Sequence, residues 1–314
     1  MFDFVFNATQ LGDFLATGVR LSVPIGFAAM GGMLCERAGV FNVALEGQLL
    51  FGAFAAAVGA YFFGAPAGGI LMAVLVGALS GVLLSVLGVT MRVNQIVVGI
   101  SIILLASGLT SFLSRVVFPQ GSNSLSLSGF KRFGLPVLDQ IPVLGTAFFT
   151  HDILVYAMLV VAVLLHLTLK YTSWGLAVRA TGESPAAADA AGAPVFLIRY
   201  GCVIIGSILA SVGGAYVVLS QVFLFSDNMT HGKGFIALAA IVLGRWAPFT
   251  TLIACLLFGV FDAYQLRLQA LQPEVPFQLF AALPYLIAIV ALVGLIGQIR
   301  APAAVGQFYD REMR

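Results

Sequence analysis

The sequence predicts an all-α, polytopic bundle of about 8–10 transmembrane helices, one of them short or broken. The chain has few charged residues: its 314 residues include 15 Lys and Arg and 13 Asp and Glu, and 61% of its residues are hydrophobic. The mean hydropathy is +1.06. Apolar stretches of about 20 residues, which match the hydrocarbon thickness of a bilayer, recur along the chain. Small residues at four-residue spacing, such as Ala73, Gly77 and Gly81, favour close helix packing in lipid.

The expected spans follow the apolar stretches. They lie near residues 13–34, 46–63, 67–91, 93–114, 151–171, 195–220, 248–268 and 276–298, with a shorter, interrupted helix near 235–246. We expect the whole chain, 1–314, to form a single transmembrane domain. Its longest connections are an external loop at 115–150 and a cytoplasmic loop at 172–194.

Basic residues orient the chain, because cytoplasmic loops carry an excess of Lys and Arg. The side of the 172–194 loop carries nine, namely Arg37, Arg92, Lys170, Arg179, Arg199, Arg245, Arg300, Arg311 and Arg314. The opposite side carries five, namely Arg115, Lys131, Arg132, Lys233 and Arg267. This bias places the C-terminus in the cytoplasm.

Several classes of function are excluded by what the sequence lacks. A net charge of +2 without any block of basic residues argues against nucleic acid as a partner, whereas membrane lipid surrounds the spans. No GxxxxGK[ST], HExxH or GxSxG motif and no clustered His or Cys set occurs, so we expect no enzyme activity, metal or cofactor in this chain. If transport uses ATP, the ATPase is another polypeptide.

Polar residues interrupt two apolar runs in the segment CERAGVFNVALEGQLLFGA. They include Glu36, Asn42 and Glu46. One interpretation is a short cytoplasmic turn, in which Glu36 pairs with Arg37 and Glu46 lies near a helix N-terminus. The other is a broken helix whose backbone and side chains line a translocation path.

Two further groups are candidates for the path. In RVNQIVVGIS, Asn94 and Gln95 open a span, where Asn94 either caps the helix or lines the path. In FGVFDAYQLRLQ, Asp262 and Gln265 share one helical face in the outer half of a span. An ionisable residue there is a functional candidate by default. The alternative is a structural ion pair with one of two arginines, Arg267 or Arg20.

The loop YTSWGLAVRATGESPAAADAAGAPV encodes a short helix outside the membrane. Ser184 fits an N-cap, Pro185 fits the first helical position, and Gly192 fits the end. Glu183 precedes this helix, and Ala187 and Asp189 lie inside it. A plain linker needs no such caps, so we expect a partner to dock here. The alternative is a helix that lies at the headgroup level.

Six segments together resemble one family. They are CERAGVFNVALEGQLLFGAF, RVNQIVVGI with LLASGLTSFL, GLAVRATGESPAAADAAG, GFIALAAIVLGRW, FGVFDAYQLRLQ and LPYLIAIVALVG. In this order, from about residue 17 to 298, they resemble bacterial ABC permeases of the nucleoside and simple-sugar group, which are related to ribose and branched-chain amino-acid permeases.

This resemblance implies the permease subunit of an ABC importer that moves nucleosides, or related simple sugars and purine-like solutes, across the bacterial inner membrane by alternating access. It implies a heterodimer with a second homologous permease, a cytoplasmic ABC ATPase that holds ATP and Mg, and a periplasmic or lipoprotein substrate-binding protein. The family's coupling helix falls on residues 184–192. The rival is an ion-coupled secondary transporter of small polar solutes, for which Asp262 and Glu46 would be the coupling carboxylates.

Overall fold

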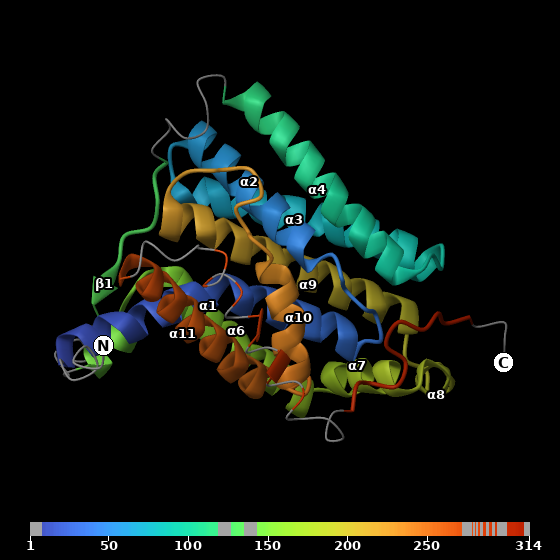
Figure 1. Ribbon diagram of the computed structural model, residues 1–314. Helices are drawn as coiled ribbons and strands as arrows, with labels where there is room; N and C mark the ends of the chain where they lie inside the picture. The colour runs from blue at the N-terminus through green and yellow to red at the C-terminus, as the bar shows by residue number, and fades with distance from the viewer. Residues whose placement is uncertain are drawn as a thin grey trace.

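The computed structural model describes residues 8–118, 127–134, 143–271 and 300–310, with isolated positions between 278 and 293. Within these residues, seven helices are long and apolar enough to cross a membrane. They are α1 (Ala8–Arg37), α2 (Leu45–Phe63), α3 (Pro66–Ser85), α4 (Gln95–Val117), α6 (Ile153–Tyr171), α9 (Val195–Tyr216) and α11 (Pro248–Leu271) (Figure 1). Two of them continue into π-helical turns, α3 into η1 (Val86–Thr90) and α9 into η3 (Val217–Val222). The predicted all-α class is confirmed.

Short elements fill the connections. They are α5 (Leu144–Phe148), α7 (Ser173–Glu183), α8 (Pro185–Ala190), α10 (Lys233–Leu243), β1 (Phe133–Gly134) and β2 (Thr150–His151). The two strands pair antiparallel, and β2 lies at the boundary between the connection expected at 115–150 and the span expected at 151–171. The 172–194 loop holds two helices where one was expected. The span expected at 276–298 lies mostly outside the described residues, as do 119–126 and 135–142 of the long connection.

Three helices, α1, α2 and α9, form the interior of the bundle. α1 packs against α9, α10 and α11, and α2 packs against α3, α4 and α9. Of the most apolar 18-residue window in each helix, 89% is buried in α1 but only 28% in α4. α4 lies at the edge of the bundle (Figure 1) and turns an apolar surface outward. That surface is typical of a helix that faces lipid or another membrane subunit.

The spans end on two opposite sides of the bundle, and α7 and α8 lie on one of these sides. There the end of α1 meets α7, because Gly182 lies directly against the Arg37 backbone. The end of η1 meets the start of α9 on the same side, where the hydroxyls of Thr90 and Tyr200 share a hydrogen bond. We call this the α7–α8 side.

α2 begins inside the bundle, away from the α7–α8 side. A Cβ on Gly47, in its first turn, would lie 2.9 Å from the carbonyl oxygen of Ile102. Ile102 is about 10 Å along the axis of α4 from Gln95, at 1.5 Å per residue. The connection 38–44 therefore runs inward before α2 starts. The backbone is therefore non-helical between α1 and α2 and reaches the bundle interior, as the broken-helix interpretation of this segment proposed.

α10 is a half-length helix in the bundle interior. It has 11 residues, which span about 16 Å, roughly half of a hydrocarbon core. It starts beside Glu46 in the first turn of α2, and Trp246 just after it contacts the last turn of α1. The short helix predicted near 235–246 is confirmed, with its start at Lys233.

Glycines let the interior helices touch. A Cβ on Gly214 in α9 would overlap the Leu49 carbonyl oxygen of α2, and one on Gly52 would overlap the Ser211 backbone. The row Gly77 and Gly81 of α3 likewise meets α9. The predicted packing role of these small residues is confirmed.

We predict that Gly214→Ala destabilises the fold, because the added methyl group has no space between α9 and α2. Overpacking of this kind costs about 1–3 kcal/mol. The thermal unfolding midpoint of the detergent-purified protein measures the effect. Gly108→Ala in α4 is the matched control, since nothing lies within 4 Å of its added Cβ. Equal midpoints for the two variants would contradict the proposed contact between α9 and α2.

Candidate functional site

A buried polar network closes the inner end of the 38–44 connection. Asn42 Nδ2 donates to Gln48 Oε1 at 3.0 Å, and Gln48 Nε2 donates to Ser207 Oγ at 2.9 Å. The Ala44 amide donates to Asn42 Oδ1 at 3.1 Å. All these side chains are buried. Asn42 therefore stabilises the helix break, with its amide committed to the protein and not to open solvent.

Glu46 binds the start of α10. Its Oε1 accepts hydrogen bonds from Thr230 Oγ1 at 2.6 Å and from the Gly232 amide at 2.9 Å. Its Oε2 accepts from the Gly234 amide at 2.7 Å. Glu46 also lies in the first turn of α2, as one of the two interpretations expected. The carboxylate thus lies at the N-terminal ends of two helices and accepts hydrogen bonds from amides that have no partner within α10.

Asp262 and Lys233 form an ion pair between α11 and α10. The Lys233 Nζ to Asp262 Oδ2 distance is 3.5 Å, and the two side chains are 15% and 16% exposed. Asp262 is in an ion pair, as one alternative proposed, but the partner that the structure shows is Lys233, where the sequence had suggested Arg267 or Arg20. Lys233 is the first residue of α10, where a cation opposes the helix dipole, so the Asp262 carboxylate offsets that cost. Gln265 lies on the same face and is half-buried.

Glu36 and Arg37 both contact Trp246, which lies three residues after the end of α10. The buried Glu36 carboxylate accepts a hydrogen bond from the Trp246 indole, and Arg37 Nε donates to the Trp246 carbonyl at 2.8 Å. The neighbour pair expected between Glu36 and Arg37 is therefore replaced by contacts to a residue about 210 positions away. These contacts fix the far end of α10 to the last turn of α1.

Asn94 and Gln95 have different roles. Asn94 is exposed and caps α4, with Oδ1 accepting from the Ile96 amide at 2.9 Å, so the capping interpretation is confirmed. Gln95 is buried, and its Oε1 accepts from the Phe41 amide at 2.7 Å. Its Nε2 has no hydrogen-bond partner among the described residues. Gln95 lines a cavity of about 340 Å³ together with Phe41 and Val305.

Three of the candidate path residues meet at α10. Glu46 holds its first amides, Asp262 pairs with its first side chain, and Glu36 binds Trp246, three residues after its end. Asn94 and Gln95 lie nearer the α7–α8 side. Trp246 was not predicted as a site residue, nor Lys233 as a partner for Asp262. A lysine next to a glycine at the start of an apolar helix was the available signal for Lys233.

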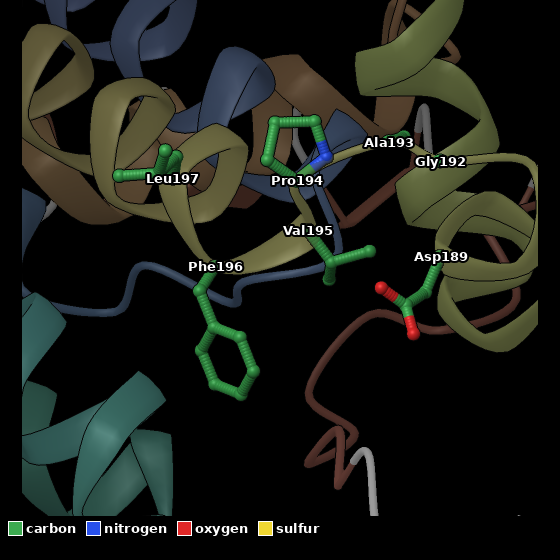
Figure 2. A pocket seen from close by; sticks show the side chains of 7 residues that line it. All are labelled: Asp189, Gly192, Ala193, Pro194, Val195, Phe196 and Leu197. Atoms are coloured by element: carbon green, nitrogen blue, oxygen red, sulfur yellow. The ribbon is translucent and has the colours of Figure 1, made fainter.

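α8 has the caps that the sequence predicts. Ser184 Oγ accepts from the Ala187 amide at 3.4 Å, Pro185 opens the helix, and Gly192 turns the chain with φ of +87°. Glu183 ends α7 just before it, and Ala187 is exposed. Beside α8 is a cavity of about 300 Å³, lined by Asp189 and residues 192–197. Figure 2 shows the Asp189 carboxylate directed toward the chain that enters α9. A partner can therefore reach both the exposed alanines and this acidic cavity.

Comparison with known proteins finds relatives along nearly the whole chain. The nucleoside ABC transporter permease protein NupC of Lactococcus lactis is 35% identical, over 97% of this chain and 98% of that protein. The guanosine ABC transporter permease protein NupQ of Bacillus subtilis is 34% identical, over 93% and 95%. A putative glucose ABC transporter permease, TsgC13 of Haloferax volcanii, is 32% identical, over 94% and 96%.

No solved structure gives a significant match to this chain. The model of the family described as "Branched-chain amino acid transport system / permease component" matches residues 14–296. The matched region contains α2, α8, α9 and α10, and α1 from residue 14 onward. This multi-pass membrane chain therefore belongs to the family of ABC transporter permease components of the branched-chain amino acid transport type.

Proposed function

We propose that the chain is the permease subunit of an ABC importer that moves nucleosides across the bacterial inner membrane. The observation that carries this proposal is the 34–35% identity, over more than nine tenths of the chain, to a guanosine and a nucleoside permease. A less similar sugar-transport relative keeps related simple sugars as the next substrate class. ATP and Mg belong to a separate ATPase, and this chain supplies the membrane path.

The partners follow from the same assignment. A cytoplasmic ATPase contacts the α7–α8 side, so that side and the C-terminus face the cytoplasm, in agreement with the excess of basic residues there. A second, homologous permease completes a heterodimer, and a periplasmic or lipid-anchored binding protein delivers the solute from outside. The short, capped α8 with exposed Ala187 and Ala190 supports a docking role, because a helix of two turns needs a partner to be ordered in water.

The path follows the interrupted helices. The half-helix α10 joins the inner end of α2 to the α7–α8 side, with polar contacts at both ends: Glu46 at its start and Glu36 after its end. Discontinuous helices of this kind form solute paths in transporters. Movement of α8 after ATP binding would tilt α10 between its two anchors and expose the path to one side at a time.

The rival, an ion-coupled secondary transporter, needs a carboxylate that gains and loses an ion in each cycle. Glu46 is held by three donors and Asp262 by Lys233, so both carboxylates already have partners. The rival also leaves the caps and the exposed face of α8 without a role.

The function is tested by uptake in cells that carry the complete transporter but lack other nucleoside transporters. Radiolabelled guanosine should accumulate when this chain is present, and excess unlabelled nucleoside should block the uptake. Excess glucose should not block it. Uptake that glucose blocks and nucleosides leave unchanged would contradict the nucleoside assignment.

We predict that Ala187→Arg and Ala190→Arg separate the permease from its ATPase. A bulky cation on the smooth face of α8 would prevent close docking, so co-purified ATPase and nucleoside uptake should both fall at least tenfold, on the order of 1.4 kcal/mol of contact energy. Ala187→Ser is the matched control and should retain both. Arg variants that keep the ATPase and transport at the wild-type rate would show that α8 is not the contact with the ATPase.

We predict a different pattern for the ion pair. Asp262→Leu leaves the Lys233 ammonium without its carboxylate, and stability should fall by roughly 1–3 kcal/mol. The double variant Asp262→Leu/Lys233→Met should regain the thermal midpoint, because no unpaired charge is left. Nucleoside uptake by the double variant should stay low, since this part of the path then lacks the Asp262 carboxylate and the Lys233 ammonium. Wild-type uptake by the double variant would make the pair a packing contact only.

A further inference from the structure

Residues 303–310 cross the α7–α8 side of the bundle, and we call them the C-terminal strap. The strap begins on α7: the Ala304 amide donates to the Gly182 carbonyl at 2.8 Å, and the Ala303 amide donates to Glu183 Oε2 at 3.4 Å. Glu183 is thereby engaged by this chain's own C-terminal region. The strap is thus attached to the end of α7 that leads directly into α8.

The middle of the strap reaches the helix break and α9. The Gly306 amide donates to the Gly39 carbonyl at 3.3 Å, in the turn that leads toward Glu46. Arg199, the fifth residue of α9, is 1% exposed, and its Nη1 donates to the Gln307 carbonyl at 3.0 Å. Its Nε and Nη2 have no partner among the described residues. A buried guanidinium depends strongly on the few partners it has, so the strap is held firmly over α9.

The end of the strap joins α8 to α4. Tyr309 is 7% exposed and packs with Ala188, the buried residue of α8, and with Val195. Its ring lies 5.8 Å from that of Phe196, centroid to centroid. The next residue, Asp310, forms an ion pair with Arg92 in the turn before α4. A single short segment therefore contacts α8 on one side and the α4 end of the bundle on the other.

We propose that the C-terminal strap is a positioning element that passes the movement of α8 to the α1–α2 connection and to α4. The inference rests on the proposed function, in which α8 meets the ATPase. α8 packs weakly on the bundle by itself, with Ala188 its single buried residue among the six. Tyr309 covers that residue, so displacement of α8 moves the strap. Movement of the strap then displaces Gly39 and Arg92, to which it is bonded. Gly39 begins the segment that leads to Glu46, and Arg92 begins the segment that leads to Gln95.

The experiment uses the complete transporter in liposomes and measures nucleoside uptake per ATP hydrolysed. Tyr309→Ala should lower this ratio at least about fivefold, the lower end of typical coupling between sites. The ATPase should still co-purify in normal amount. Gln307→Ala removes a neighbouring exposed side chain but keeps the backbone carbonyl that Arg199 binds, and it should leave the ratio unchanged.

A charge exchange keeps the test informative if Tyr309→Ala folds poorly. Asp310→Arg and Arg92→Asp each place like charges together and should lower the ratio, whereas Asp310→Arg/Arg92→Asp should restore it to within about twofold. An unchanged ratio in all variants, a double variant as poor as the single ones, or loss of the ATPase from Tyr309→Ala would each overturn the role of the strap. None of these results affects the Ala187→Arg test of α8 itself.

Discussion

The position of α10 depends on one carboxylate, that of Glu46. The first amides of a helix have no partner within the helix, and in a membrane interior no bulk water replaces one. Glu46 supplies that partner for Gly232 and Gly234. Once α10 starts there, Lys233 must meet a carboxylate on α11, and Trp246 arrives beside the last turn of α1. Glu36, Glu46 and Asp262 thus all bind the same half-length helix or Trp246, just beyond its end.

This arrangement differs from the packing of the long helices. α1, α2 and α9 touch through glycines with little free space, and such contacts are difficult to rearrange. α10 is instead attached at its ends by hydrogen bonds and an ion pair, which can exchange for other polar partners at low cost. A transporter needs both properties: a rigid frame and an element that can tilt within it. The α7–α8 side adds a third feature, an outer surface through which an ATPase can act.

Local patterns in the sequence were sufficient for much of this structure. Apolar length predicted the described spans, and the series Ser184, Pro185 and Gly192 predicted α8, because both depend on neighbouring residues. Contacts between distant segments were not predictable. Asp262 meets Lys233, and Glu36 meets Trp246, because helices cross at angles that no single segment specifies. Sequence alone therefore identified the polar residues of the candidate path but not their partners.

The central claim is that Glu46 anchors the start of α10, and amide hydrogen exchange of residues 232–238 tests it most directly. Replacement of Glu46 by Ala removes three hydrogen bonds to a charged acceptor. If the claim is correct, exchange in this segment should accelerate by about ten- to a hundredfold in Glu46→Ala, while exchange in α9 stays unchanged. Equal exchange rates for residues 232–238 in the variant and the wild-type protein would contradict it.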